Sequence, residues 1–258
     1  MTPTIDLTRE ELLRIYDRAA EDYCRSLPLE HFMESTYQST QRKITLESLD
    51  LVSAVWPEFQ VFSELLILYP LTEADLKKPT RVCPDNMVIV HDERIDAVGS
   101  FNVPLQPVGP TLILEYVSQG NQRKDYVDNR VRYAHDLKVP FYLLFEPEPQ
   151  KLTVLQLKGA KYVTVKPNSD GRLAIPPLEL EVALHDSWVR FWFRGELLPL
   201  PGELLLERDA ERLRADREKL RADEERTARL TMEAENARLR EELSRLKSPR
   251  SGQNGFNH

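Results

Sequence analysis

The chain has 258 residues, of which 41% are hydrophobic and 30% are charged, and its formal net charge is −7. This length allows one sizeable domain with an appendage, and the negative charge excludes a general electrostatic attraction to nucleic acid, so a DNA site would need a local basic patch or metal ions. Cys24 and Cys83 lack metal-ligand spacing, and no signal peptide or membrane span is recognisable, so we expect a cytoplasmic protein with free thiols and no membrane partner.

Two helices and a strand are predicted in the first seventy residues. The first helix begins at Thr8, where Glu11 lies three residues on and completes a capping box, and it ends before Pro28. A second helix runs over about 39–54, where apolar residues form one stripe. The apolar run over 60–69 is predicted to be one strand.

The middle of the chain predicts a strand–helix–strand unit. Residues 86–91 and 111–118 are apolar runs of strand length. Asp125 is expected to cap the helix that follows, and 141–145 is a wholly apolar strand, which is typical of the middle of a sheet. Two strands joined by a helix favour a parallel pair.

Further strands complete the predicted domain. Residues 152–157 and 162–165 flank a Lys-Gly-Ala-Lys turn and predict a β-hairpin, and 178–184 and 188–193 predict two short strands. We therefore expect residues 1–200 to form an α/β domain with a mixed central sheet flanked by helices.

A long charged helix is predicted over 201–247. Between Glu203 and Lys247, thirteen acidic and twelve basic residues are mixed with Leu and Ala, without Gly or Pro. At ~1.5 Å per residue, this helix would be roughly 65 Å long, which exceeds the diameter of the domain. Residues 248–258 are expected to be a disordered tail.

The leucines of this helix predict an interrupted coiled coil that would join two copies of the chain. Four of them form two pairs with seven-residue spacing: Leu213 and Leu220, and Leu239 and Leu246. Asp216 and Asp223 interrupt the seam between them. A single charged helix without a partner is the alternative.

Two acidic residues stand in unusual places. Asp85 follows a proline and opens the 86–91 run, and Glu115 lies between aliphatic residues inside the 111–118 run. A buried carboxylate without a partner is costly, but two acids on adjacent strands can share a bound cation, which is a common arrangement in sites that cut phosphodiesters. The alternatives are a carboxylate paired with a nearby Arg for Glu115, and an ordinary Pro-Asp turn for Asp85.

Together these features resemble a known group of nucleases. The segments that carry the resemblance are Pro84–Val90, Leu114–Ser118, Arg123–Asp125, Arg132–Ala134 and Val139–Leu143. The stretch over 28–192 resembles the Uma-type restriction endonucleases, a family of bacterial nucleases in the PD-(D/E)XK superfamily. The resemblance implies a restriction-endonuclease-like fold, Asp85 and Glu115 as ligands of Mg²⁺ or Mn²⁺, and hydrolysis of DNA.

The lysine of this superfamily has no direct counterpart. Two residues after the Glu, where the superfamily has lysine, the chain has Val117, and the position in the following helix that aligns with the family's lysine is Asn129. The basic residues left nearby are Lys124, Arg130 and Arg132. Arginine hardly acts as a base because its pKa exceeds ~12, and Lys124 can reach back from the turn. The resulting candidate catalytic set is Asp85, Glu115 and Lys124.

A third acid would complete the metal site that the resemblance implies. The candidates are Glu30, Glu34 and Glu64. Two functions follow as alternatives: a magnesium-dependent endonuclease, or a catalytically inactive nuclease-fold module that binds or assembles through its C-terminal helix. We also expect a homodimer through that helix.

Overall fold

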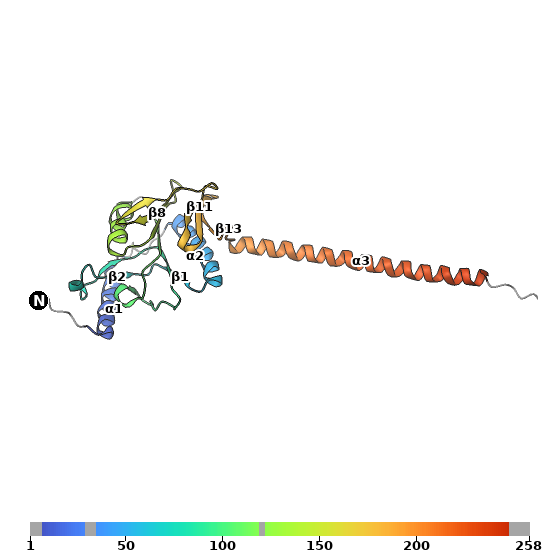
Figure 1. Ribbon diagram of the computed structural model, residues 1–258, viewed down its shortest axis with the longest axis horizontal. Coiled ribbons are helices and arrows are strands. Elements are labelled where there is room, and N and C mark those ends of the chain that lie inside the picture. Colours follow the sequence, from blue (N-terminus) through green and yellow to red (C-terminus); the bar gives the residue numbers. More distant parts are fainter. Residues whose placement is uncertain (1–6, 29–34, 119–121, 248–258) are drawn as a thin grey trace, which may run out of the picture. The chain divides into compact units, whose positions relative to one another are not determined.

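The computed structural model describes residues 7–28, 35–118 and 122–247 (Figure 1). Contacts divide the chain between Leu200 and Pro201 into two units, which are described separately. Among the described helices, none is long and apolar enough to cross a membrane. The predicted α/β class is confirmed by the first unit, in which helices cover mixed sheets.

The first two helices begin at capping boxes. Thr8 caps α1 (Arg9–Ser26) and exchanges hydrogen bonds with Glu11, as predicted. Ser35 caps α2 (Thr36–Val55) in the same way, so α2 begins three residues earlier than the apolar stripe indicated.

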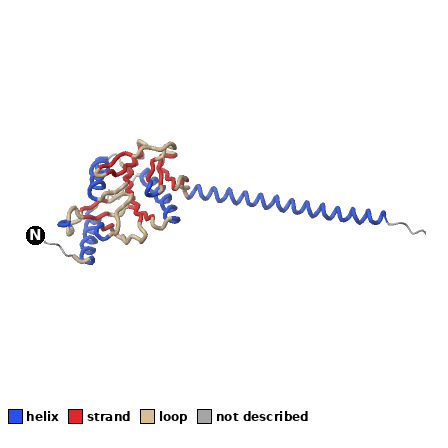
Figure 2. Tube along the Cα trace, viewed as in Figure 1, coloured by secondary structure: helices blue, strands red, loops and turns tan. Residues whose placement is uncertain are grey.

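The central sheet has six strands in the order β1-β4-β6-β7-β8-β9. Figure 2 shows the strands of the first unit in red and its helices in blue. Their bounds are β1 Phe59–Ser63, β4 Asn86–Val90, β6 Leu112–Tyr116, β7 Phe141–Glu146, β8 Lys151–Lys158 and β9 Lys161–Thr164. Strands β6 and β7 are parallel, which confirms the strand–helix–strand prediction, and the other neighbours are antiparallel. The β8–β9 hairpin is also confirmed.

The single strand predicted over 60–69 is wrong. Glu64 has a φ of 50°, a left-handed conformation that is uncommon for a non-glycine residue, and it ends β1. The chain then enters a different sheet of three strands in the order β3-β2-β5. These are β2 Ile67–Tyr69, β3 Thr80–Val82 and β5 Phe101–Asn102.

A third sheet is wholly antiparallel and has the order β10-β11-β12-β13. Its strands are β10 Leu173–Ile175, β11 Leu180–His185, β12 Trp188–Phe193 and β13 Glu196–Leu197. Gln41 of α2 joins it, because its side-chain amide donates to the carbonyl of Val189 at 3.1 Å and accepts from the same residue's N–H at 2.8 Å. Short 3₁₀ turns lie at Glu73–Asp75 (η2), Val103–Leu105 (η3) and Pro176–Leu178 (η6).

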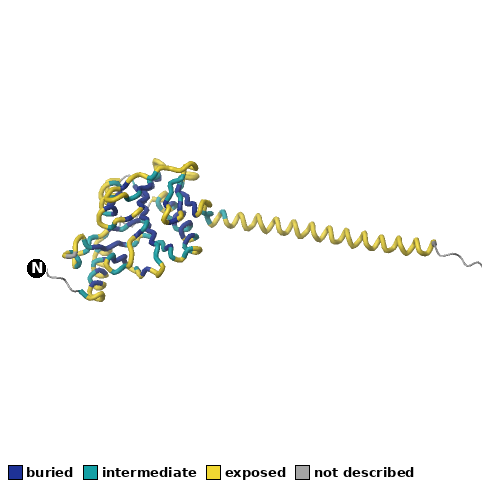
Figure 3. The backbone as a smooth tube through the Cα atoms, in the orientation of Figure 1, coloured by how far each residue is buried: buried dark blue, intermediate teal, exposed yellow. Residues whose placement is uncertain are grey.

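Strand β6 is buried on both faces and separates two hydrophobic cores. Leu112, Leu114 and Tyr116 pack with α2 and the antiparallel β10–β13 sheet, whereas Ile113 and Val117 pack on the opposite face. This alternation follows from the two-residue period of a strand. Figure 3 shows the strands of the first unit buried and α3 exposed along its length.

Between β6 and β7, residues 122–136 form a helix that contains two π-helical segments, η4 (Lys124–Asn129) and η5 (Arg132–Asp136). Their turns close five residues apart rather than four, as in the Leu137 N–H to Arg132 carbonyl bond of 3.1 Å. The second unit contains α3 (Pro201–Lys247), which agrees with the predicted long helix.

Candidate active site

The structure brings Asp85 and Glu115 together. Asn86 of β4 is opposite Leu114 of β6, so the next pair along the antiparallel register is Asp85 and Glu115. The backbone N–H of Asp85 donates to Oε2 of Glu115 at 3.4 Å, and the N–H of Tyr116 donates to Oδ2 of Asp85 at 2.6 Å. Two acids that are 30 residues apart in sequence therefore share one place in the sheet.

The carboxylate of Glu115 is almost inaccessible, with 2% of the residue exposed. Its Oε1 accepts hydrogen bonds from the hydroxyl of Tyr133 at 2.7 Å and from Nδ2 of Asn129 at 3.2 Å. Burial, and then the charges of Asp85 and Asp125, raise the pKa of Glu115 well above its ordinary value. Burial also raises the pKa of Asp85, although the Tyr116 N–H opposes this.

Asp125 is a member of this cluster, and its predicted role as a helix cap is wrong. It lies inside the helix over 122–136, only 2% exposed, where burial raises its pKa to about 6. Nδ2 of Asn129 donates to Oδ1 of Asp125 at 3.2 Å as well as to Glu115. The signal that could have found it is the spacing of Asp125, Asn129 and Tyr133 by four, which places polar groups on one helix face.

Lys124 lies beside the acids. Its Nζ is 3.9 Å from Oδ1 of Asp125, and 49% of the side chain is exposed. Burial lowers the pKa of Lys124, but the carboxylates of Glu115, Asp125 and Asp85 together outweigh it, so the pKa is raised. Lys124 is therefore a cation at neutral pH in this environment.

The other residues at or near the expected lysine positions have different surroundings. Arg130 donates to the carbonyl of Tyr162 at 3.3 Å, and Arg132 lies near Tyr69, where its charge opposes a rise in the pKa of that phenol. Val117 is 1% exposed and packs in the second core. Of the three basic candidates, Lys124 is the one whose charge is among the main causes that lower the pKa of both acids.

Arg42 is a partner of Asp85 that the sequence did not reveal. From α2, its Nη2 lies 3.5 Å from Oδ1 of Asp85, and its Nη1 lies 3.0 Å from Oε1 of Glu64. Glu64, one candidate for the third acid, therefore pairs with Arg42, and 66% of its side chain is exposed. The other candidates, Glu30 and Glu34, lie outside the described residues.

Replacing Arg42 by methionine should lower the free energy of unfolding by about 1–3 kcal/mol at neutral pH, because the carboxylate of Asp85 loses its cationic partner. Protonation of Asp85 removes the need for that partner, so the difference should shrink as the pH falls toward about 4. Urea unfolding at both pH values, with Arg42→Lys as the control, measures this. An equal loss at both would show that Arg42 contributes through packing alone.

The oxygen atoms of this cluster suit a hard divalent cation such as Mg²⁺ or Mn²⁺. Asp85 and Glu115 supply carboxylates whose charges repel each other, and the buried Oδ1 of Asn129 accepts no hydrogen bond from any described residue. Within the described ranges, no three His, Cys, Asp or Glu side chains form a metal-binding group. A cation here would therefore have two carboxylate ligands, with water or substrate oxygens completing its coordination, as is common for Mg²⁺.

Comparison with known proteins gives one family. Residues 48–188 match the Uma2 family, which is described as "Putative restriction endonuclease". No curated protein matches the chain. Among solved structures, a crystal structure of a "putative nuclease belonging to DUF820 from Anabaena variabilis ATCC 29413" is 14% identical. That match covers 56% of this chain and 75% of that one, with a TM-score of 0.42.

Proposed function

Because the chain belongs to the Uma2 family of restriction-endonuclease-like proteins, we propose that it hydrolyses phosphodiester bonds of DNA with the help of Mg²⁺ or Mn²⁺. The observation that carries this proposal is the pair of carboxylates, half-buried Asp85 and buried Glu115, that meet between adjacent strands. Burial raises the pKa of both groups, and the charge of Asp85 raises that of Glu115 further, so the ionised pair is costly; a bound cation would relieve the repulsion between the two carboxylates.

Asp85 and Glu115 are the residues that would hold the metal ion. When bound, such an ion lowers the pKa of a coordinated water and neutralises charge on the scissile phosphate. The protein fixes the two carboxylates in advance: the Tyr116 N–H holds Asp85, and Tyr133 and Asn129 hold one oxygen of Glu115. Fixed donors of this kind avoid reorganisation during the reaction.

Lys124 is the third residue of the proposed catalytic set. Because the neighbouring carboxylates keep it protonated, its role would be to bind a phosphate oxygen or orient the attacking water, rather than to accept a proton. It also supplies a positive charge where DNA would approach, which matters in a chain whose net charge is −7. We propose a cytoplasmic location, in agreement with the free thiols of Cys24 and Cys83.

Calorimetric titration with MnCl₂ tests the metal site. The wild-type protein should release or absorb saturable heat, and Asp85→Asn should lose this signal, because one of two carboxylate ligands becomes an amide. Glu146→Gln is the matched control, since Glu146 is also buried in the central sheet but bonds Tyr126, Gln122 and Lys151 instead. Equal binding by wild type and Asp85→Asn would disprove this metal site.

The alternative is a catalytically inactive module that acts through α3. It is favoured by Val117 and Asn129, which occupy the positions where the resembled nucleases have lysine. Asn129→Lys discriminates the two functions in a plasmid-cleavage assay. If Lys124 already supplies the charge, the variant should change the rate by less than about tenfold. Cleavage that only Asn129→Lys shows, with Asn129→Met as control, would support the inactive module.

A further inference from the structure

Most of the leucine and methionine residues of α3 fall into two blocks with a seven-residue repeat, and Leu204, Leu205 and Leu230 lie outside it. In such a heptad, positions a and d face a partner helix, and positions e and g flank them. The d positions are Leu206, Leu213 and Leu220 in the first block, and Met232, Leu239 and Leu246 in the second. Ala210 and Arg217 occupy a in the first block, and Asn236 and Leu243 occupy a in the second. These d residues and Leu243 are between 50% and 78% exposed, so the second unit by itself leaves both seams open to solvent.

The charges beside the two seams repeat with one polarity. Acidic residues occupy four g positions, Asp209, Asp216, Glu235 and Glu242, and arginines occupy three e positions, Arg214, Arg221 and Arg240; Glu207 and Glu233 also lie at e. In a parallel pair of helices, each g residue faces the e residue of the next heptad in the partner, so acids meet bases. In an antiparallel pair, g faces g and e faces e, which sets like charges against each other.

We infer that α3 pairs with α3 of a second copy of this chain, parallel and in register. This inference does not depend on the proposed nuclease activity. It also changes the role of Asp216, which the sequence analysis placed in the seam: with Leu213 and Leu220 at d, it lies at g and contributes charge pairing.

The break between the blocks fixes the register. Leu220 and Met232 are 12 residues apart, so the seam moves around the helix by about 120° between them. A partner displaced by one heptad would place its break opposite a regular block, whereas an unshifted copy matches both blocks. Asn236 adds to this, because a buried polar residue at a prefers its own counterpart.

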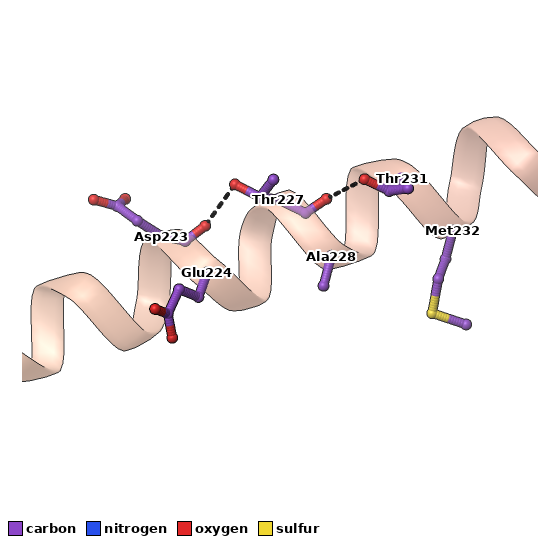
Figure 4. A pocket seen from close by; sticks show the side chains of 6 residues that line it. All are labelled: Asp223, Glu224, Thr227, Ala228, Thr231 and Met232. Atoms are coloured by element: carbon purple, nitrogen blue, oxygen red, sulfur yellow. Dashed lines mark hydrogen bonds between the residues drawn. The ribbon is translucent and has the colours of Figure 1, made fainter.

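The segment between the blocks can lie against a second helix at low cost. The hydroxyl of Thr227 donates to the carbonyl of Asp223 at 2.8 Å, and that of Thr231 donates to the carbonyl of Thr227 at 2.9 Å (Figure 4). These hydroxyls therefore need no water. Ala228 and Met232 project from one side of the helix, which forms a shallow apolar surface where the seam changes face.

Disulfide cross-linking of the full-length protein tests this arrangement. Cys24→Ser and Cys83→Ser remove the two native thiols. In that background, Ala210→Cys and Asn236→Cys place a thiol at an a position of each block. Both should give covalent dimers under mild oxidation, because parallel chains in register bring like a positions together.

Matched controls use alanines on the opposite side of the helix. Ala215→Cys and Ala234→Cys occupy f positions, which face away from the seam in each block, and should remain monomeric on the same gel. Cross-linking of the f variants to the same extent would show random collision. No cross-link at 210 or 236, or sedimentation of the full chain as a monomer at micromolar concentration, would overturn the inference.

Charge reversal tests the polarity separately. Asp209→Lys with Asp216→Lys sets bases against Arg214 and Arg221 of the second copy and should weaken the dimer at least about tenfold. Adding Arg214→Glu and Arg221→Glu should restore it. A dimer that the first pair of changes leaves unaffected would exclude the parallel arrangement.

Discussion

Replacing Glu115 by glutamine should reduce metal-dependent cleavage of DNA by at least about a hundredfold. The amide keeps the shape of the side chain and can still accept the hydrogen bonds from Tyr133 and Asn129, but it removes one of the two negative charges that would hold the metal ion. Because the buried environment already disfavours the charged form, the fold should survive the change. Relaxation of supercoiled plasmid in MgCl₂ or MnCl₂ measures the rate.

The control for this experiment is Glu146→Gln, which makes the same chemical change in the neighbouring strand β7. It should retain cleavage, and EDTA should abolish the activity of both wild type and control. Cleavage that survives EDTA, or that is equal in wild type and Glu115→Gln, would identify a contaminating nuclease and remove the support for the proposed site.

The metal-free protein should become less stable, relative to Glu115→Gln, as the pH rises. The pKa values of Asp85, Glu115 and Asp125 are all raised in the folded state, so the folded protein binds more protons than the unfolded chain above the ordinary values of 3.8 and 4.5. The free energy of unfolding that these groups contribute is therefore fully present below those values and is lost as the pH rises through their raised pKa values, which for Asp125 is about 6.

Thermal unfolding in EDTA, from pH 4 to pH 8, measures this difference. Glu115→Gln should equal wild type at the acid end and become progressively more stable toward the alkaline end. MnCl₂ at about 100 times its Kd should stabilise the wild type by about 2.7 kcal/mol and leave the variant unchanged. If the difference in stability between wild type and Glu115→Gln were the same at every pH, the carboxylates of this cluster would not repel one another in the folded protein.

The parts of the fold that sequence predicted well depend on local signals. The capping box of Thr8 and Glu11 lies within one turn, and the β8–β9 hairpin needs only a short turn between two strands. The faces of β6 followed from simple alternation of its side chains. The position of Glu115 inside an apolar strand was visible for the same reason.

The features that sequence did not predict depend on distant contacts or unusual backbone. The left-handed Glu64 divides a continuous apolar run between two sheets, and nothing in the residue type indicates that conformation. Arg42 reaches Asp85 across 43 residues, so only the folded chain shows the pair. Asp125 has the residue type of a helix cap, and its burial depends on a helix that begins before it.

The two π-helical segments of the helix over 122–136 make the exact number of residues in this helix important for the site. In an ordinary α-helix, each residue lies slightly further around the axis than the residue four positions before it. A π-helical turn contains more residues and shifts the side chains in the opposite direction. The alternation of α-helical and π-helical turns therefore keeps Asp125, Asn129 and Tyr133 aligned on the one helix face that contacts β6. Deletion of a single residue here would rotate the following side chains by about 100° and disconnect Tyr133 from Glu115. This segment should therefore tolerate many exchanges of side chain on its outer face, but neither insertion nor deletion.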